Sequence, residues 1–246
     1  MVEVVEHGPI RELRLARPPV NALDPALMRA LREALRDAVA GGCEAVVLSG
    51  GLDVPTLLTL DRDGILETWR TFFGLLRDLA TSPVPVVAAL TGHSPAGGTV
   101  LALFADHRVQ AAGEYFIGLN EVRVGLPVPE VLFRALVYVV GERQAARLAV
   151  GGLLIGPDEA LRVGLVDDVA PLAEVVPRAV AWARDLLGRP RAAMTATRVL
   201  ARRALVTAFD SVDEPMVAAV AEQWFTPEAQ ATLRALAARL KPTGSR

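Results

Sequence analysis

The alternation of short apolar runs with segments of helical spacing constrains the fold of this chain most. Two short, almost wholly apolar runs, residues 45–49 and 84–90, each follow a stretch whose apolar residues recur at helical spacing. Such runs are typical of strands that are buried on both faces of a parallel sheet. Parallel neighbours need a crossover connection, usually a helix. The order strand, helix, strand, helix, strand therefore predicts an α/β core.

Local signals place the other elements. Residues 2–6 and 11–15 alternate around His7-Gly8-Pro9, which predicts a hairpin. Asp24 is a good N-cap and Pro25 suits a first helical position, so a helix should start there and stop at Gly41-Gly42. Further helices are expected at about 65–80, 98–105, 129–140, 143–149 and from 177 to 240, with short strands at 108–111 and 115–117.

Composition excludes several classes of protein. Hydrophobic residues make up 52% and charged residues 22% of the 246 positions, which favours a folded globular chain over a disordered one. A single cysteine excludes a disulfide framework. With only three histidines in the sequence, we do not expect a histidine-built metal centre, and we expect no metal. The net charge of −2 offers no global attraction for nucleic acid.

Hydropathy bears on partners and compartment. The apolar runs are too short to cross a bilayer, and the first ten residues have no basic segment followed by an apolar one. We therefore expect a cytoplasmic protein without membrane contact. The mean hydropathy of +0.36 is high for a soluble monomer and predicts a buried interface between copies of the chain.

Three junctions between a predicted strand and a loop are candidates for chemistry. They lie at 49–53, 91–98 and 116–121, and each contains glycine. Glycine lets a ligand approach the backbone, and loops at strand ends often carry function. A helix starting near Gly98 would present free N–H groups that suit a developing oxyanion. Taken alone, each junction is equally compatible with an ordinary tight turn.

Six motifs together resemble one family. They are RPPVNAL at 17–23, GLDV at 51–54, PAGG at 95–98, ADHR at 105–108, GLNE at 118–121 and GLVD at 164–167. In this order they resemble the crotonase superfamily, the enoyl-CoA hydratase/isomerase family, over about residues 1–190. The similarity is greatest to its Δ3,Δ2-enoyl-CoA isomerases. The resemblance implies an α/β, crotonase-like β-β-α spiral core at 1–190 and a C-terminal helical oligomerisation region at 191–246.

The resemblance also assigns roles to residues. It implies that Glu121 is the catalytic acid/base and that the backbone N–H groups of Leu52 and Gly97 form an oxyanion hole. The substrate, an acyl-CoA thioester, would contact Gly51, Leu52, Asp53, Gly97, Asn120 and Ala22. No cofactor is implied, because CoA arrives as part of the substrate. The expected assembly is a homotrimer or hexamer.

The chain departs from the hydratases of this family at one informative position. They carry a second glutamate three residues after the oxyanion glycine, where this chain has Val100. Hydration needs two carboxylates to hold and activate water, so a single one favours the isomerase. Hydration or another crotonase-type reaction, and a non-catalytic acyl-CoA-binding scaffold, are the alternatives. The strand also runs almost directly into the GLDV motif at Gly50-Gly51, where family members usually have several more residues.

Other conspicuous residues have plainer interpretations. We expect His93 to be structural or pocket-lining, and Asp167-Asp168 to form a turn at a strand end. Arg202-Arg203 could meet CoA phosphates, but a solvated helix face is the favoured interpretation. The apolar stripe from Trp69 to Leu79 is expected to be core or acyl-pocket wall.

Overall fold

The computed structural model describes residues 1–17, 21, 23–50 and 60–240, and only the backbone at 236–240. The strands are β1 (Val2–His7), β2 (Ile10–Leu15), β3 (Ala45–Gly50), β4 (Val86–Leu90), β5 (Ser94–Pro95), β6 (His107–Ala111), β7 (Ile117–Gly118) and β8 (Asp168–Ala170). The helices up to residue 187 are α1 (Pro25–Ala40), α2 (Arg62–Ala80), α3 (Gly97–Leu103), the 3-10 helix η2 (Glu121–Val124), α4 (Glu130–Val150), α5 (Pro157–Arg162), the 3-10 helix η3 (Leu172–Glu174) and α6 (Val175–Leu187). The later helices are α7 (Arg191–Ala201), α8 (Arg203–Thr207), the 3-10 helix η4 (Ala208–Ser211), α9 (Glu214–Gln223) and α10 (Pro227–Leu240).

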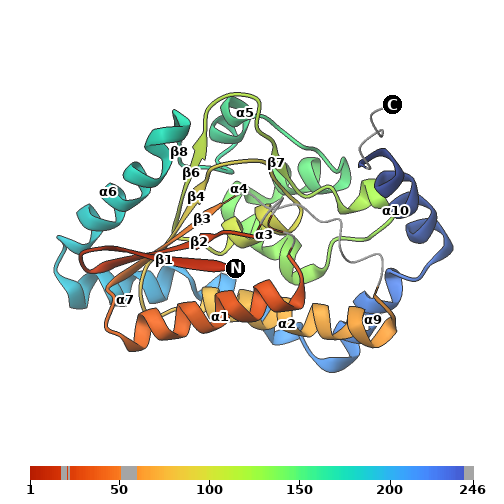
Figure 1. Cartoon of the computed structure of the whole chain (residues 1–246), viewed down its shortest axis with the longest axis horizontal. Coiled ribbons are helices and arrows are strands. Elements are labelled where there is room, and N and C mark those ends of the chain that lie inside the picture. The colour runs from red at the N-terminus through yellow and green to blue at the C-terminus, as the bar shows by residue number, and fades with distance from the viewer. Residues whose placement is uncertain (18–20, 22, 51–59, 241–246) are drawn as a thin grey trace.

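The predicted α/β core is confirmed. The main sheet has the order β1-β2-β3-β4-β6-β8, and every pair in it except β1–β2 is parallel. Figure 1 shows α6 on one face of this sheet, while α3 and α4 lie on the other and α1 and α2 run beside it. Because both faces are covered, β4 is apolar throughout and β3 is apolar except for the buried Ser49, as the sequence predicts.

The N-terminal elements follow their local signals. β1 and β2 form the predicted hairpin, with His7 opposite Ile10 and a left-handed turn at Gly8 (φ 74°) that glycine adopts without strain. Asp24 caps α1, because its Oδ1 accepts the backbone N–H of Leu27 at 2.9 Å. The side chains at helical spacing in α1 are buried, which fixes this helix against the sheet.

Some boundaries differ from the sequence prediction. The strand expected at 115–117 is Ile117–Gly118, and it pairs with Ser94–Pro95 in a second, two-stranded sheet. The two helices expected at 129–140 and 143–149 are confirmed: α4 consists of two helical parts, separated at Gly141 by non-helical backbone (φ 76°, ψ 160°). The helical pattern predicted up to residue 240 is present as α6 to α10.

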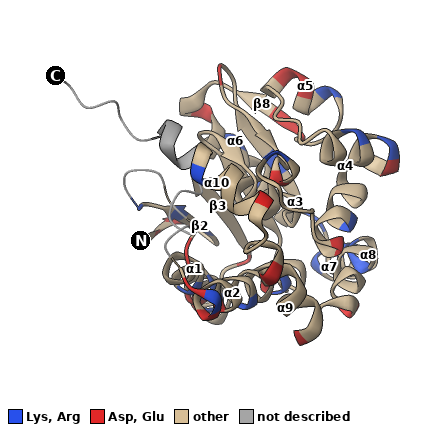
Figure 2. Ribbon diagram, turned by 90° about the vertical axis from the view of Figure 1, so that its right-hand side faces the viewer, with Lys and Arg blue, Asp and Glu red and all other residues tan. Residues whose placement is uncertain are grey.

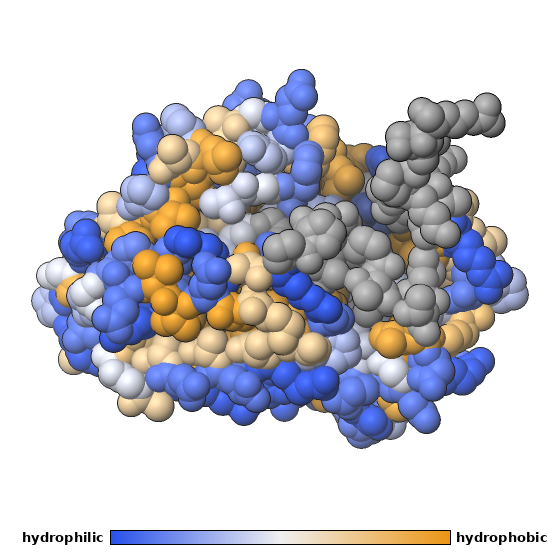
Figure 3. Space-filling view, viewed as in Figure 1, coloured by the Kyte–Doolittle hydropathy of each residue, from blue (hydrophilic) through white to orange (hydrophobic). Residues whose placement is uncertain are grey.

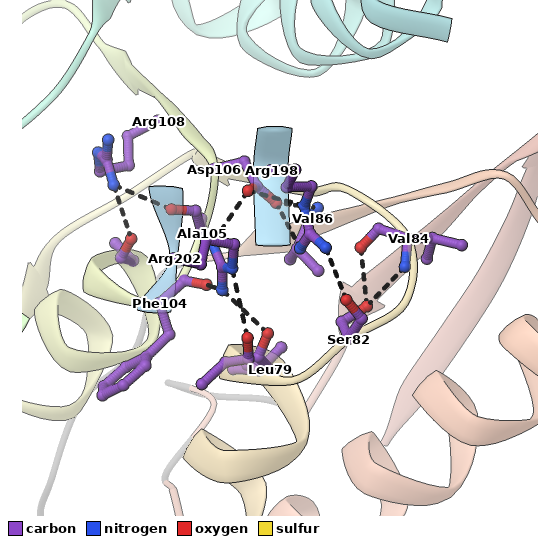
Figure 4. Close-up of polar contacts among 12 residues, drawn as sticks. Leu79, Ser82, Val84, Val86, Phe104, Ala105, Asp106, Arg108, Arg198 and Arg202 are labelled. Atoms are coloured by element: carbon purple, nitrogen blue, oxygen red, sulfur yellow. Dashed lines mark hydrogen bonds and ion pairs between the residues drawn. The ribbon is translucent and has the colours of Figure 1, made fainter. Parts of the chain in front are cut away.

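The interpretation of Arg202 as part of a solvated face is wrong. Its guanidinium donates to the carbonyls of Leu79 and Phe104 at 3.1 and 2.8 Å and pairs with Asp106 at 3.0 Å (Figure 4). These carbonyls lie at the ends of α2 and α3, where helix carbonyls lack intrahelical partners. Arg198 forms a second, two-pronged pair with the same carboxylate at 2.9 Å. The two arginines therefore attach the C-terminal helices to the core, while Arg203 is exposed as expected.

Charged side chains of both signs are distributed over the outer helices. Figure 2 shows them interspersed on α4 and α5, where Arg147 pairs with Glu159 at 2.9 Å. On the face in Figure 3, hydrophobic patches alternate with hydrophilic side chains, and a hydrophilic band follows the lower edge where α1 and α2 lie. Within the described residues, no helix combines the length and apolarity needed to cross a membrane.

Candidate active site

A mainly apolar cavity of about 160 Å³ lies between the core and the C-terminal helices. Its hydrophobic walls come from distant parts of the chain: Leu23, Met28, Trp69, Phe72, Val100, Leu126, Leu132, Trp224 and Leu233. Trp69 stacks on Phe73 with ring centroids 5.5 Å apart, so the aromatic wall on α2 is well ordered. The predicted role of the α2 stripe as core and pocket wall is confirmed at Trp69 and Phe72.

Glu121 is the acidic side chain of this cavity. It begins η2 and is only 9% exposed, and its buried Oε2 has no hydrogen-bond partner. Burial raises the pKa of its carboxyl from 4.5 to about 7, while a hydrogen bond with its own backbone acts in the opposite direction. Among the described residues that line the cavity, no other is acidic. A carboxyl that titrates near neutral pH can both accept and return a proton.

The start of α3 forms the opposite side of the cavity. Ala96 precedes this helix with φ 46° and ψ −114°, a conformation that is strained for any residue except glycine. Gly97 follows it and lines the cavity, and the first N–H groups of a helix have no intrahelical acceptor. A Cβ on Gly97 would lie 2.9 Å from Cδ2 of Leu23, so a larger residue here would require that side chain to move.

Gly118 determines the path of the backbone that leads to Glu121. It has φ 151°, and a Cβ there would lie 2.0 Å from the carbonyl oxygen of Leu153. Only glycine fits, and the two-stranded sheet that it ends therefore packs directly on the segment after α4. Leu119, Asn120 and Glu121 follow at once, so this close packing places Asn120 and Glu121 at the cavity.

The structure brings together part of the predicted site. Gly97, Asn120 and Glu121, expected from two separate motifs, all line one cavity. The other expected contact residues, Ala22, Gly51, Leu52 and Asp53, lie outside the described residues. Val100, at the position of the hydratases' second glutamate, also lines the cavity with its apolar side chain.

The residues for which we expect a structural role, His93 and Asp167, have contacts that agree with it. His93 stacks on Phe116, with centroids 5.5 Å apart, and does not line the cavity. Asp167 accepts the backbone N–H of Arg108 at 2.8 Å just before β8, which agrees with a turn at a strand end. The described residues contain no group of three or more His, Cys, Asp or Glu placed to hold a metal ion.

Two wall residues were not predicted from the sequence. Trp224 and Leu233 belong to the C-terminal helical region, yet they are 4% and 7% exposed and line the cavity beside Glu121. Leu233 lies in the region for which the resemblance implies a role in oligomerisation, yet in the structure its side chain packs within the same chain. Trp224, which is followed by Phe225, is a sequence signal that this region packs on the core, because large aromatic side chains favour burial.

Comparisons with known proteins agree with the geometry. A family model described as enoyl-CoA hydratase/isomerase matches residues 6–226. The chain is 31% identical to mouse mitochondrial enoyl-CoA delta isomerase 1 over 214 residues, which cover 83% of this chain and 74% of that protein. It is 36% identical to the probable enoyl-CoA hydratase echA17 of Mycobacterium avium over 197 residues, 76% of this chain and 75% of that one. The crystal structure of human mitochondrial delta3-delta2-enoyl-CoA isomerase superposes with a TM-score of 0.90 at 28% identity, over 98% of both chains.

Proposed function

Because the chain belongs to the enoyl-CoA hydratase/isomerase family and has its crotonase fold, we propose that it is a Δ3,Δ2-enoyl-CoA isomerase. It would convert a 3-enoyl-CoA into the conjugated 2-enoyl-CoA. CoA is part of the substrate, and the reaction requires no cofactor. Its relatives include both an isomerase and a probable hydratase, so the choice between these two reactions is the central question.

The observation that carries the proposal is that Glu121 is the one acidic side chain among the described residues that line the cavity. Glu121 is acidic, buried and unpaired at Oε2, whereas Val100 is apolar at the position where hydratases carry their second glutamate. Addition of water needs groups that hold and polarise the water molecule, and the walls near Glu121 are mainly hydrophobic. Movement of a double bond needs only one group that takes and returns a proton.

The proposed chemistry is a proton transfer between two carbons. The Glu121 carboxylate takes a proton from Cα of the 3-enoyl thioester, and the electron pair of the broken C–H bond moves to the thioester oxygen. The resulting dienolate collapses as the same carboxyl delivers a proton to Cγ, which leaves the double bond between Cα and Cβ. A pKa of about 7 suits both steps, because the group is then neither too weak a base nor too weak an acid near neutral pH.

Backbone N–H groups would stabilise the enolate oxygen. The Gly97 N–H, at the cavity wall, is one proposed donor and the Leu52 N–H is the other. Each such donor contributes about 3 kcal/mol to transition-state stabilisation. Asn120 would lie against the bound acyl group, and Ala22, Gly51 and Asp53 would line the groove for CoA. We also propose a homotrimer or hexamer.

Hydration is the second candidate, favoured by the 36% identity to a probable enoyl-CoA hydratase. The test is to incubate the purified protein separately with a 3-enoyl-CoA and a 2-enoyl-CoA and to follow the absorbance of the conjugated thioester. We expect absorbance to appear with the first and to persist with the second. Loss of the 2-enoyl-CoA at a rate comparable to isomerisation would overturn the assignment, and acyl-CoA binding without turnover of either would indicate a scaffold.

A further inference from the structure

We propose that Thr99 is a positioning residue for the isomerisation, which it serves without touching the substrate. Its hydroxyl joins the start of α3, which carries Gly97, to the two-stranded sheet that leads to Glu121. This inference rests on the proposed function, because it concerns the relative placement of the proposed oxyanion donor and the proposed acid/base.

The hydroxyl makes two short hydrogen bonds in a fully buried position. Thr99 is 0% exposed; its Oγ1 donates to the Ser94 carbonyl at 2.6 Å and accepts the Gly118 N–H at 2.7 Å. Ser94 belongs to β5 and Gly118 to β7, while Thr99 itself lies in the first turn of α3. A single oxygen therefore connects three backbone segments.

The ladder between β5 and β7 completes this connection. The N–H of Ser94 donates to the Phe116 carbonyl at 2.8 Å, and the N–H of Ala96 donates to the Gly118 carbonyl at 2.9 Å. With the Thr99 bonds, both backbone groups of Gly118 are thus tied to the chain just before and just inside α3. Gly118 cannot move away, because the Leu153 carbonyl lies against its Cα.

The connection explains how the Ala96 backbone is maintained. Its φ of 46° with ψ of −114° is strained for a residue with a Cβ, and such conformations persist only where their surroundings over-determine them. The N–H of Ala96 donates to the Gly118 carbonyl, and the N–H of Gly118 donates in turn to the Thr99 hydroxyl, three residues after Ala96. These two bonds hold the Ala96 backbone in place. Release of the Thr99 bonds would let Ala96 relax and would turn the Gly97 N–H away from its present direction.

Loss of the hydroxyl should therefore affect turnover rather than binding. The hydrophobic walls proposed to hold the acyl group come mainly from α1, α2, α4 and the C-terminal helices, whereas the Thr99 hydroxyl bonds to Ser94 and Gly118 in the two-stranded sheet. A misplacement of reacting groups by 1 Å can cost about 10²-fold in rate. For Thr99→Val, which keeps the shape but can neither donate nor accept, we expect kcat to fall about 10- to 100-fold with KM nearly unchanged.

The experiment compares Thr99→Val with Thr99→Ser and with a matched control, Thr71→Val. Serine retains the hydroxyl and should keep kcat within about threefold of the natural protein. Thr71 is also buried, at 4% exposed, and among the described residues its hydroxyl donates to Glu67 on its own helix, outside the cavity. Its substitution therefore reports the effect of removing a threonine hydroxyl that connects no segments of the site. For each protein we would measure steady-state kinetics with a 3-enoyl-CoA, the affinity for a saturated acyl-CoA and the free energy of unfolding in urea.

The expected result is a lower kcat in Thr99→Val alone, with acyl-CoA affinity retained. A kcat equal to that of the natural protein, a loss that appears only in KM, or an equal loss in Thr71→Val would each overturn the role of Thr99. If Thr99→Val does not fold, Thr99→Ala takes its place with the same expectation. Absence of isomerisation in the natural protein would instead refute the proposed function, which separates the two failures before any variant is made.

Discussion

Replacement of Glu121 by glutamine should make the protein more stable at alkaline pH. The folded carboxyl has its pKa raised from 4.5 to about 7 by burial, and its buried Oε2 has no partner that would stabilise the charge. The folded state therefore holds the proton more tightly than the unfolded state. This contribution to stability is complete below pH 4.5 and is lost as the pH rises through 7.

The magnitude follows from the interval between the two pKa values. Each pH unit of that interval corresponds to about 1.4 kcal/mol, so the charged carboxylate destabilises the fold by about 3 kcal/mol once the pH is well above 7. Glutamine has nearly the same shape and never ionises. Between pH 5 and pH 8, the free energy of unfolding of Glu121→Gln relative to the natural protein should rise by about 2–3 kcal/mol.

The assay is urea unfolding of the natural protein and the variant at pH 5, 6, 7 and 8. The pH dependence of all other groups cancels in the difference between the two proteins. Glu114→Gln is the matched control, because Glu114 is exposed and lies outside the cavity. A flat difference for Glu121→Gln would refute the reasoning, since it would mean that this carboxylate is solvated or paired.

Three further predictions concern activity, the C-terminal attachment and assembly. The kcat/KM for a 3-enoyl-CoA should rise with pH and level off above an apparent pKa near 7, because Glu121 must be deprotonated to act as the base; a profile with no inflection between pH 6 and 8 would contradict this. Asp106→Asn should lower the free energy of unfolding by about 3 kcal/mol or more, because it leaves the guanidinium groups of Arg198 and Arg202 buried without their carboxylate, and a loss below 1 kcal/mol in urea would disprove that role. Light scattering at micromolar concentration should give the mass of a trimer or hexamer, since Val150, Val199 and Leu200 are exposed apolar side chains, and a monomer would exclude it.

The elements that the sequence predicts well are those specified by neighbouring residues. The start of α1 follows from Asp24 and Pro25, and β3 and β4 follow from their apolar composition, because caps and buried strands have local signatures. The strands β5 and β7 were not recognised in their correct place. Each contains only two residues, and their pairing depends on contacts between segments that are distant in sequence.

The site shows the same division. Motif resemblance places Gly97, Asn120 and Glu121, and the structure brings all three to one cavity. The neighbours of Glu121 in sequence do not account for the burial of its carboxyl, because the adjacent Val122 is 40% exposed. The 3-10 helix η2, which Glu121 begins, packs against α4 and α10, elements that the local sequence does not reveal as its neighbours.

Arg202 illustrates why such contacts cannot be inferred from composition. An arginine on a helix far from the core segments is normally solvated, and nothing near it in sequence indicates otherwise. Its partners are carbonyls at the ends of α2 and α3 and the Asp106 carboxylate, which come together only in the folded chain. Carbonyls at the end of a helix lack intrahelical donors, and only the folded structure shows which side chain supplies one.

The central claim is that Glu121 carries the proton in the isomerisation, and one comparison tests it most directly. The rate of conversion of a 3-enoyl-CoA by Glu121→Gln is measured beside that of the natural protein and of Glu114→Gln, together with the affinity of each for a saturated acyl-CoA. We predict that Glu121→Gln retains affinity but loses at least ~10²–10⁴ in kcat, because the amide cannot accept the proton. Turnover by Glu121→Gln close to that of the natural protein would contradict the account.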